Sequence, residues 1–385
     1  MRTIKIIHSA DFHLDSPFEG LSAAKAAVRR SEQRDLLTAL VELASAEEAD
    51  LMLLSGDLLD GGTTYRETGD ELVSALQNSP CPVFISPGNH DFYSERSPYA
   101  KLKLPDHVRV FTKNAIRFYS VPGADARVYG AAFTDRSCAP LLKGFHAERK
   151  AGIYNLLCMH GEVGVPGSQY NPISAEDLAA SGMDYAALGH VHKSCGLQKS
   201  GNTWYSWPGC PEGRGFDETG EKTVNIVTLE GSNASLETRS IAKRRYYSVS
   251  LDVTGKDPLL LIHTSLPDDS ADDIYRITLT GASERSPDLR RLQQNLDGMF
   301  FSLQLLDRTV PPADLWECAG NDTLRSGFHL IRRRVFTLLL HRKCVARRHL
   351  PRQRGRQGSL PFCKHKIRSS LGFPFARGSC HAPTR

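Results

Sequence analysis

Residues 49–57 read ADLMLLSGD, and this stretch decides the fold. A short apolar run without alternation, stopped by Gly56 and Asp57, is typical of a strand that is buried on both faces. Four other segments repeat the form of an apolar run that ends in glycine or polar residues. They are IKIIHSADFH at 4–13, PVFISPGNHD at 82–91, YNLLCMHGEV at 154–163 and DYAALGHVHK at 184–193. The chain therefore contains a set of buried strands with polar ends.

Helical patterns lie between these strands. Residues 31–48 place a row of apolar side chains on one helical face, and a second helix is predicted around 67–77. The row consists of Leu36, Leu37, Leu40, Val41 and Ala44. Two further strands, 222–230 and 235–241, have the composition of antiparallel edge strands. We predict a layered α/β domain over residues 1–242.

The pattern changes after residue 242. Strands are predicted at 245–255 and 273–281, and residues 288–306 read as a helix that runs into another strand. We predict a separate, small α+β domain over residues 243–320.

The charge of the chain is divided unevenly. Residues 321–385 contain 16 Lys and Arg and one acid, Asp322, whereas the rest of the chain has 32 Lys and Arg against 42 Asp and Glu. Folded domains intersperse both signs of charge, and this tail does not. We interpret it as disordered or out of frame, and a DNA-binding arm is the alternative reading.

Composition also indicates the cellular environment expected for the protein. The nine cysteines include no CxxC pair, which argues against a disulfide framework and a structural zinc site. Cys81 and Cys158 lie in apolar runs and are predicted to be buried thiols, so a reducing cytoplasm is expected. No apolar run reaches 18 residues and the N-terminus has no cleavage pattern, so neither a membrane span nor a secretory signal is predicted.

Each of the five apolar segments described first ends in residues that can bind a metal ion. Because the carboxyl ends of strands in α/β sheets converge on one crevice, we expect these side chains to meet there. In Asp11-x-His13 and His190-x-His192, we expect strand alternation to put both side chains on the same side. The set consists of Asp11, His13, Asp57, Asn89, His90, His160, His190 and His192.

Oxygen and imidazole ligands without thiolate suit Mn²⁺, Mg²⁺, Fe²⁺ or Zn²⁺. The set is large enough for two ions, which can polarise a phosphoryl group and stabilise the transition state of phosphodiester hydrolysis. His90 exceeds the coordination count and is the candidate acid for the leaving oxygen. Asp91 is expected to orient His90 or a neighbouring group.

Single motifs have simpler readings. Asp11 alone would be a turn residue, and the Asn89 segment alone would be a loop with a left-handed turn. Their joint occurrence at successive strand ends favours the metal site. The remaining histidines are expected elsewhere: His8 in the core or partly exposed, and three on the solvated surface, namely His107, His146 and His263.

Together these motifs resemble the calcineurin-like metallophosphoesterases, in particular the SbcD-type DNA repair exonucleases and their YhaO-like branch. The resemblance rests on HSADFHLDSPFEGL at 8–21, LLSGDLLD at 53–60, SPGNHDFY at 86–93, DYAALGHVHK at 184–193 and YSWPGCPEGRGFDETGEKTVNIVTLE at 205–230. It covers roughly residues 1–320. It implies a β-sandwich flanked by helices, and a capping domain in the place of residues 243–320.

The resemblance also implies a function for the site. One manganese ion would take Asp11, His13 and His192, the other would take Asn89, His160 and His190, Asp57 would bridge them, and His90 would be catalytic. DNA would be the substrate, and an SMC-like ATPase would be a partner, although the tail lacks the mixed-charge helices that bind it. We also consider a homodimer. The leading hypothesis is a DNA exonuclease or endonuclease in DNA repair. The alternatives are a small-molecule phosphodiesterase or phosphatase and a non-catalytic DNA-end-binding scaffold.

Overall fold

The computed structural model describes residues 2–61, 64–121, 123–267 and 270–312. These residues lie in the first of the two units into which contacts divide the chain, residues 1–313. The predicted tail at 321–385 lies outside the described residues. The boundary at 242/243 stays a prediction.

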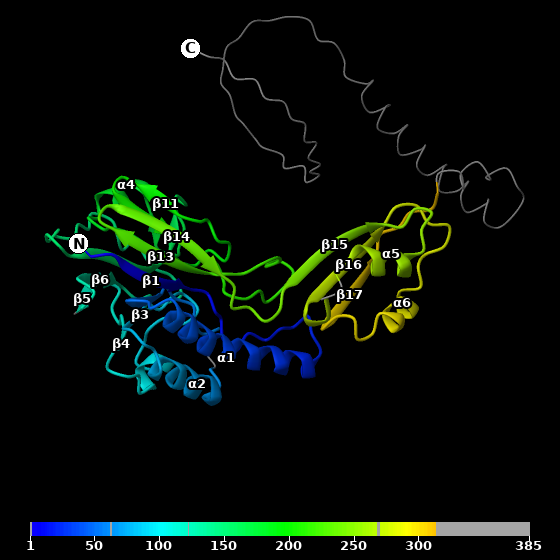
Figure 1. The fold of residues 1–385 in the computed structure, drawn as a ribbon, viewed down its shortest axis with the longest axis horizontal. Coiled ribbons are helices and arrows are strands. Elements are labelled where there is room, and N and C mark those ends of the chain that lie inside the picture. The colour runs from blue at the N-terminus through cyan, green and yellow to red at the C-terminus, as the bar shows by residue number, and fades with distance from the viewer. Residues whose placement is uncertain (1, 62–63, 122, 268–269, 313–385) are drawn as a thin grey trace, which may run out of the picture. The chain divides into compact units, whose positions relative to one another are not determined.

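Two six-stranded sheets form the larger part of the described chain (Figure 1). The first sheet has the order β14 (Asn233–Arg239), β13 (Val224–Glu230), β1 (Ile4–Ser9), β2 (Leu51–Leu54), β3 (Val83–Ile85) and β4 (Val108–Val110). The second has the order β11 (Gln198–Ser200), β12 (Thr203–Ser206), β10 (Tyr185–Gly189), β7 (Tyr154–His160), β6 (Ala126–Gly130) and β5 (Arg117–Val121). The strands β1 to β4 are parallel, and so are β12, β10, β7 and β6.

The two sheets pack on a shared apolar core. Because neighbouring side chains of a strand point to opposite faces, each central strand also contributes to a second core on its outer face. In β1, Ile6 packs into the core between the sheets, whereas Ile7 packs into the core beneath the helices. In β7, Leu156 faces the first sheet and Leu157 packs into a third core on the outer face. This double burial explains the unbroken apolar runs in the sequence. The predicted α/β class with a helix-flanked sandwich is confirmed.

Helices cover the outer faces of the sandwich. α1 (Ala23–Ala46) and α2 (Arg66–Gln77) pack on the first sheet, and α4 (Ala175–Ala180) belongs to the core on the outer face of the second. The remaining short elements here are α3 (Pro98–Lys101), β8 (Glu162–Val163) and β9 (Pro172–Ile173). The predicted apolar face of the first helix is confirmed, but the helix begins eight residues earlier, after the N-cap Ser22.

The early turns of α1 escaped the sequence pattern because their buried side includes charged residues. Arg29 is fully buried and donates to Glu32 (2.8 Å) and to Glu212 (2.5 Å). Glu32 also accepts hydrogen bonds from Arg244 Nη2 (2.6 Å) and from Arg244 Nε (2.8 and 3.0 Å). Such a paired network can replace apolar packing, but a search for apolar residues cannot find it.

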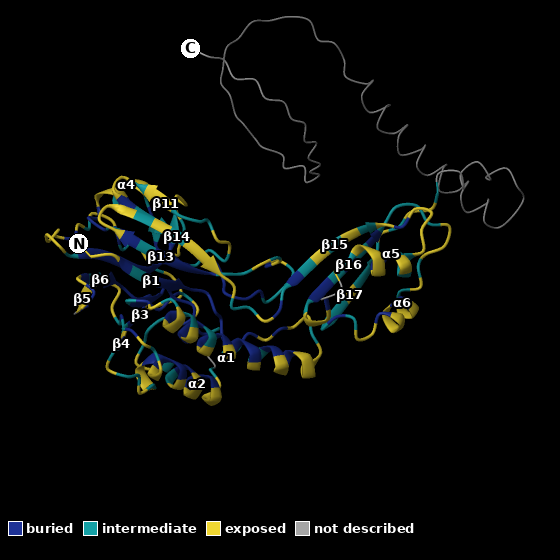
Figure 2. Cartoon of the chain, viewed as in Figure 1, coloured by how far each residue is buried: buried dark blue, intermediate teal, exposed yellow. Residues whose placement is uncertain are grey.

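The strands β13 and β14 differ in exposure. Both are antiparallel, as predicted, and β14 lies at the edge with mostly exposed side chains, as Figure 2 shows. β13 was also predicted at an edge, and this was wrong. It lies between β1 and β14 and is buried over most of its length, because β1 needs a partner on its other side.

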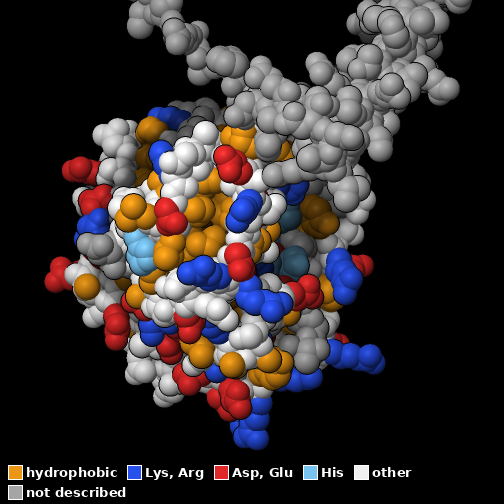
Figure 3. Space-filling view, turned by 90° about the vertical axis from the view of Figure 1, so that its right-hand side faces the viewer, with side chains coloured by type: hydrophobic (Ala, Val, Ile, Leu, Met, Phe, Trp, Pro, Cys, Tyr) orange, Lys and Arg blue, Asp and Glu red, His pale blue; other side chains and the backbone are white. Residues whose placement is uncertain are grey.

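The last described segment forms a three-stranded parallel sheet with its own core. Its elements are β15 (Tyr246–Asp252), α5 (Pro258–Ser265), a 3₁₀ turn (Ser270–Asp272), β16 (Ile274–Thr280), α6 (Leu289–Asn295) and β17 (Ser302–Asp307). The predicted strands and the helix before β17 are confirmed. The sequence analysis missed α5, which connects the parallel strands β15 and β16 and so forms a βαβ unit with them. On the face in Figure 3, acidic and basic side chains are interspersed around hydrophobic ones.

Two further expectations can be compared with the described residues. No helix among them is both long and apolar enough to cross a bilayer. Cys81 and Cys158 are free and buried, as predicted. Burial raises the pKa of the Cys158 thiol to about 12, which favours the unreactive thiol form.

Candidate functional site

The predicted ligands leave the strands through unusual backbone. Asp11 (φ 57°), His13 (φ 46°), Asp57 (φ 51°) and His190 (φ 92°) all have positive φ, a conformation that side chains other than glycine rarely adopt. Asp11 and His13 lie in one candidate cluster, as expected, but strand alternation is not the reason, because β1 ends at Ser9. Such strained residues concentrate at functional sites, where the surrounding structure holds them in place.

Asp11, His13 and His192 form the first candidate cluster, with ligand atoms all within 4.8 Å of one another. His13 Nε2 lies 3.2 Å from His192 Nε2, and His192 Nε2 lies 3.9 Å from Asp11 Oδ1. Asp11 and His13 are buried, whereas His192 is partly exposed. The first cluster thus opens to solvent on the side of His192.

Asp57, His160 and His190 form the second candidate cluster. Gly189 pairs with His160 in the β10–β7 register, which brings His190 beside His160. Asn89 adds an oxygen, since its Oδ1 lies 3.0 Å from His160 Nε2 and 3.1 Å from His190 Nδ1.

Asp57 lies between the two clusters. Its Oδ2 is 3.4 Å from His160 Nε2 and 3.7 Å from His13 Nε2. Because a carboxylate can bind two cations, this is the position expected of a bridging ligand.

The second nitrogen of each histidine explains why the site suits a cation. His160 Nδ1 faces the carbonyl of Ser55 (2.9 Å), and a carbonyl can only accept, so this nitrogen carries the proton. In the same way, carboxylates face the other three histidines: Glu218 faces His192 Nδ1 (2.6 Å), Asp60 faces His13 Nδ1 (3.4 Å) and Glu162 faces His190 Nε2 (3.2 Å). The opposite ring nitrogen of each histidine faces the cluster, which is the arrangement found in metal sites.

Electrostatics point the same way. Burial raises the pKa of the Asp11 carboxyl to about 7, because desolvation of its charge outweighs the attraction of the nearby histidines. Burial alone would lower the pKa of His160, but Asp57 and then Asp11 outweigh it and raise this pKa to about 9. The site therefore attracts positive charge, and a proton and a metal ion would compete for His160.

His90 lies beside the clusters and is more exposed than the other seven residues. Its ring is 4.6 Å from the ring of His13, and its Nδ1 donates to Asp60 Oδ1 (3.0 Å). This hydrogen bond raises the pKa of His90. Asp60 itself is held by Ser16 Oγ (3.2 Å) and lies close to His13, so the candidate acid and the first cluster share one carboxylate.

Asp91 orients the backbone around Asp57. Its carboxylate accepts hydrogen bonds from the N–H groups of Gly88 (2.7 Å), Asp57 (3.2 Å) and Leu58 (2.8 Å) and from the Tyr99 hydroxyl (2.6 Å). Asp91 thus fixes the loop that carries a neighbouring ligand, which was one of its two expected roles. The partner of His90 is Asp60, and the sequence analysis missed this residue.

Glu162 and Glu218 were also missed as partners of His190 and His192. Glu162 follows His160 by two residues, so the spacing already used for Asp11 and His13 could have found it. Glu218 lies 26 residues after its partner and is joined to Arg214 Nη2 (2.7 Å), and no local signal indicates it.

The other histidines are placed as follows. His8 is fully buried between Tyr185 Oη (2.8 Å) and the carbonyl of Leu188 (3.2 Å). His146 and His263 are exposed, as predicted. His107 is only partly exposed and its Nε2 donates to the carbonyl of Leu76 (3.0 Å), so it is less solvated than predicted.

Sequence comparison assigns part of the chain to a known family. The family model of the calcineurin-like phosphoesterases matches residues 4–194, which contain all eight predicted site residues. These residues form a calcineurin-like metallophosphoesterase domain. The chain is 26% identical over 262 residues to the metallophosphoesterase YhaO of Bacillus subtilis (strain 168), which covers 65% of this chain and 64% of YhaO.

Two further proteins are similar to this chain. The DNA double-strand break repair protein Mre11 of Aeropyrum pernix is 24% identical over 268 residues, covering 65% of this chain and 64% of that protein. The SbcD component of the nuclease SbcCD of Rhodobacter capsulatus is 31% identical over 110 residues, covering 27% of this chain and 24% of that protein. The chain thus spans less than two thirds of the length of these relatives.

Proposed function

We propose that this metallophosphoesterase is a DNA exonuclease or endonuclease that uses two divalent ions, with manganese as the native metal. The observation that carries the proposal is the convergence of four imidazole nitrogens, whose opposite ring nitrogens face oxygen acceptors, and three side-chain oxygens on adjoining clusters. Asp11, His13 and His192 would hold one ion, and the other would be held by Asn89, His160 and His190, with Asp57 between them. Ions bound there would polarise the phosphoryl oxygens and offset their developing charge.

His90 is the proposed general acid. Asp60 accepts from His90 Nδ1 and raises the pKa of the ring, so the protonated form persists towards neutral pH. His90 Nε2 then remains to give a proton to the leaving oxygen. Asp60 acts through His90 and is a positioning residue.

DNA as the substrate is supported by the Mre11 and SbcCD relatives. Mixed charges on the face in Figure 3 give no support of their own. An SMC-like ATPase partner, a homodimer and a cytoplasmic location belong to the same proposal. A small-molecule phosphodiesterase is the second candidate, since the same ligands serve any phosphate diester.

The test uses the full chain. Metal content after purification from manganese-supplemented medium should approach two ions per chain. With Mn²⁺, the protein should degrade single- or double-stranded DNA, and an Asp57→Asn variant should not. Cleavage of bis(p-nitrophenyl) phosphate and cyclic nucleotides without cleavage of DNA would favour the second candidate. DNA binding without turnover of any diester would favour a scaffold.

A further inference from the structure

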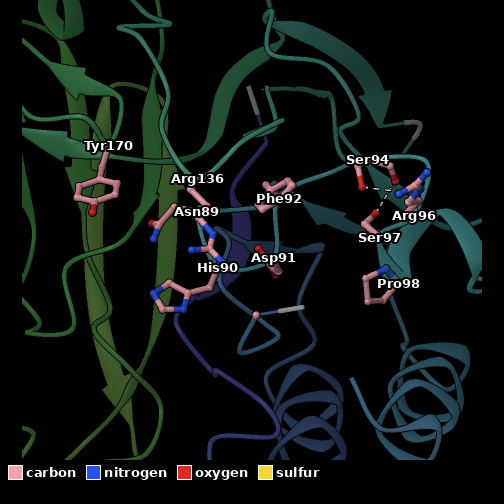
Figure 4. A pocket seen from close by; sticks show the side chains of 11 residues that line it. Asn89, His90, Asp91, Phe92, Ser94, Arg96, Ser97, Pro98, Arg136 and Tyr170 are labelled. Carbon is pink, nitrogen blue, oxygen red and sulfur yellow. Dashed lines mark hydrogen bonds between the residues drawn. The ribbon is translucent and has the colours of Figure 1, made fainter. Parts of the chain in front are cut away.

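A cavity of about 510 Å³ lies beside His90 and borders the second ligand cluster at Asn89. Its lining includes Asn89, His90, Phe92, Arg96, Arg136 and Tyr170 (Figure 4). If His90 protonates the leaving oxygen, as the proposed function requires, the leaving group must occupy the space that His90 lines. The chemistry of this cavity therefore indicates which leaving groups it accepts.

Two arginines give the cavity a positive lining. The side chains of Arg96 and Arg136 are exposed, and neither guanidinium makes an ion pair or hydrogen bond within the described part of the chain. In Figure 4 the Arg136 side chain extends towards Asn89 and His90, whereas Arg96 lies beyond Phe92. The nearby Asp135 carboxylate accepts instead from the Arg136 backbone N–H (2.7 Å). Unpaired guanidinium groups beside a phosphoesterase site suit a further phosphate.

The rim that carries Arg136 is tied to the ligand strands. The loops around Cys138 and Tyr170 form a β-bridge, with Cys138 N–H donating to the Gln169 carbonyl (2.8 Å). The buried Asn171 donates from Nδ2 to the carbonyl of His160 (2.8 Å). These contacts fix the loop that carries Arg136 relative to the candidate metal ligand His160.

An aromatic surface completes the cavity. The Tyr170 ring lies against that of His190, with centroids 4.8 Å apart and planes at 34°, and remains 38% exposed. Exposed aromatic rings next to a cationic surface are used by proteins to stack nucleobases. The volume suits one nucleotide, since pockets for small ligands span about 300–1,000 Å³.

We infer that this cavity is a subsite for a nucleotide on the leaving side of the scissile bond, with Arg136 binding the next phosphate. Arg136 is a specificity residue, and the inference rests on the proposed function. The preferred substrates then carry at least two phosphates in one nucleotide chain. A simple diester would react without help from the subsite.

The test compares four substrates with the full chain and Mn²⁺: d(TpT), d(pTpT), d(TpTp) and bis(p-nitrophenyl) phosphate. Charged hydrogen bonds are worth about 1.5–3 kcal/mol, so one of the two phosphorylated dinucleotides should exceed d(TpT) in kcat/KM by about tenfold or more. Arg136→Ala should abolish this preference while d(TpT) and the nitrophenyl diester change by less than about twofold. Arg117→Ala, an exposed arginine on the edge strand β5, is the matched control and should behave as the native protein.

An Arg136→Ala variant that retains the full preference would overturn the inference. Equal losses on all four substrates would overturn it too, because Arg136 would then act on catalysis or folding. If the native chain hydrolyses none of them, the DNA assay of the proposed function decides that function separately, and the subsite is judged by binding. Calorimetry in EDTA should then show that Arg136→Ala binds whichever phosphorylated dinucleotide the native chain binds more tightly about tenfold more weakly than Arg117→Ala does, and equal affinities would refute the subsite.

Discussion

Replacing Glu218 by Gln should weaken one metal site and spare the other. Glu218 Oε1 accepts from His192 Nδ1 at 2.6 Å, and its carboxylate also accepts from Arg214 Nη2 (2.7 Å) and from the Arg214 backbone N–H (2.8 Å). Glutamine keeps the volume but loses the charge and turns amide hydrogens towards the guanidinium. The Arg214 guanidinium, whose Nη2 lies 3.1 Å from His192 Nδ1, would then no longer be neutralised by the Glu218 carboxylate.

The expected magnitude follows from the position of this carboxylate. Loss of a carboxylate behind a ligating histidine costs about 10–100-fold in metal affinity, or about 1.4–2.7 kcal/mol. The upper half of that range is expected, because Glu218 is nearly buried and has two partners.

Titration of metal-depleted protein with Mn²⁺, followed by the EPR signal of free Mn²⁺, should reveal two classes of site of which only one weakens. The exposed Glu221→Gln is the control, and thermal midpoints in EDTA test the fold. Unchanged affinity at both sites, or equal losses at both, would refute the role of Glu218 behind His192.

Three other perturbations test separate parts of the chain. His90→Ala should lower kcat on DNA by about 10²–10⁴-fold, but far less on bis(p-nitrophenyl) phosphate, whose leaving group needs little protonation; equal losses would exclude the acid role. Gly88→Ala should disturb metal stoichiometry measured by plasma mass spectrometry, because the new Cβ would collide with the Asp57 carboxylate, whereas the open Gly20→Ala should not. Burial lowers the pKa of His8 from 6.5 to about 3, so between these values the unfolded chain binds more protons than the folded one. The free energy of unfolding should thus fall by about 2 kcal/mol from pH 7.5 to pH 5, and urea unfolding of His8→Gln should lack this part of the fall.

Much of the fold was predictable because it depends on local patterns. Strands buried on both faces produce unbroken apolar runs, and helix α1 produces an apolar row, so their existence could be read from short windows. The interior place of β13 and the early start of α1 could not. Both depend on partners distant in the chain: β13 pairs with β1, and the buried Arg29 needs Glu212.

The sequence by itself determined the kinds of side chains at the strand ends and hence the candidate metal chemistry, because ligand type is a property of each residue. Only the tertiary structure decided how these residues group. Left-handed backbone at Asp11, His13 and Asp57, and the β10–β7 register, set which side chains share a cluster. The structure also supplied the carboxylates of Asp60 and Glu218, which orient the imidazoles from separate loops. Distance along the chain carries no information about such contacts, because the fold alone brings them within a hydrogen bond.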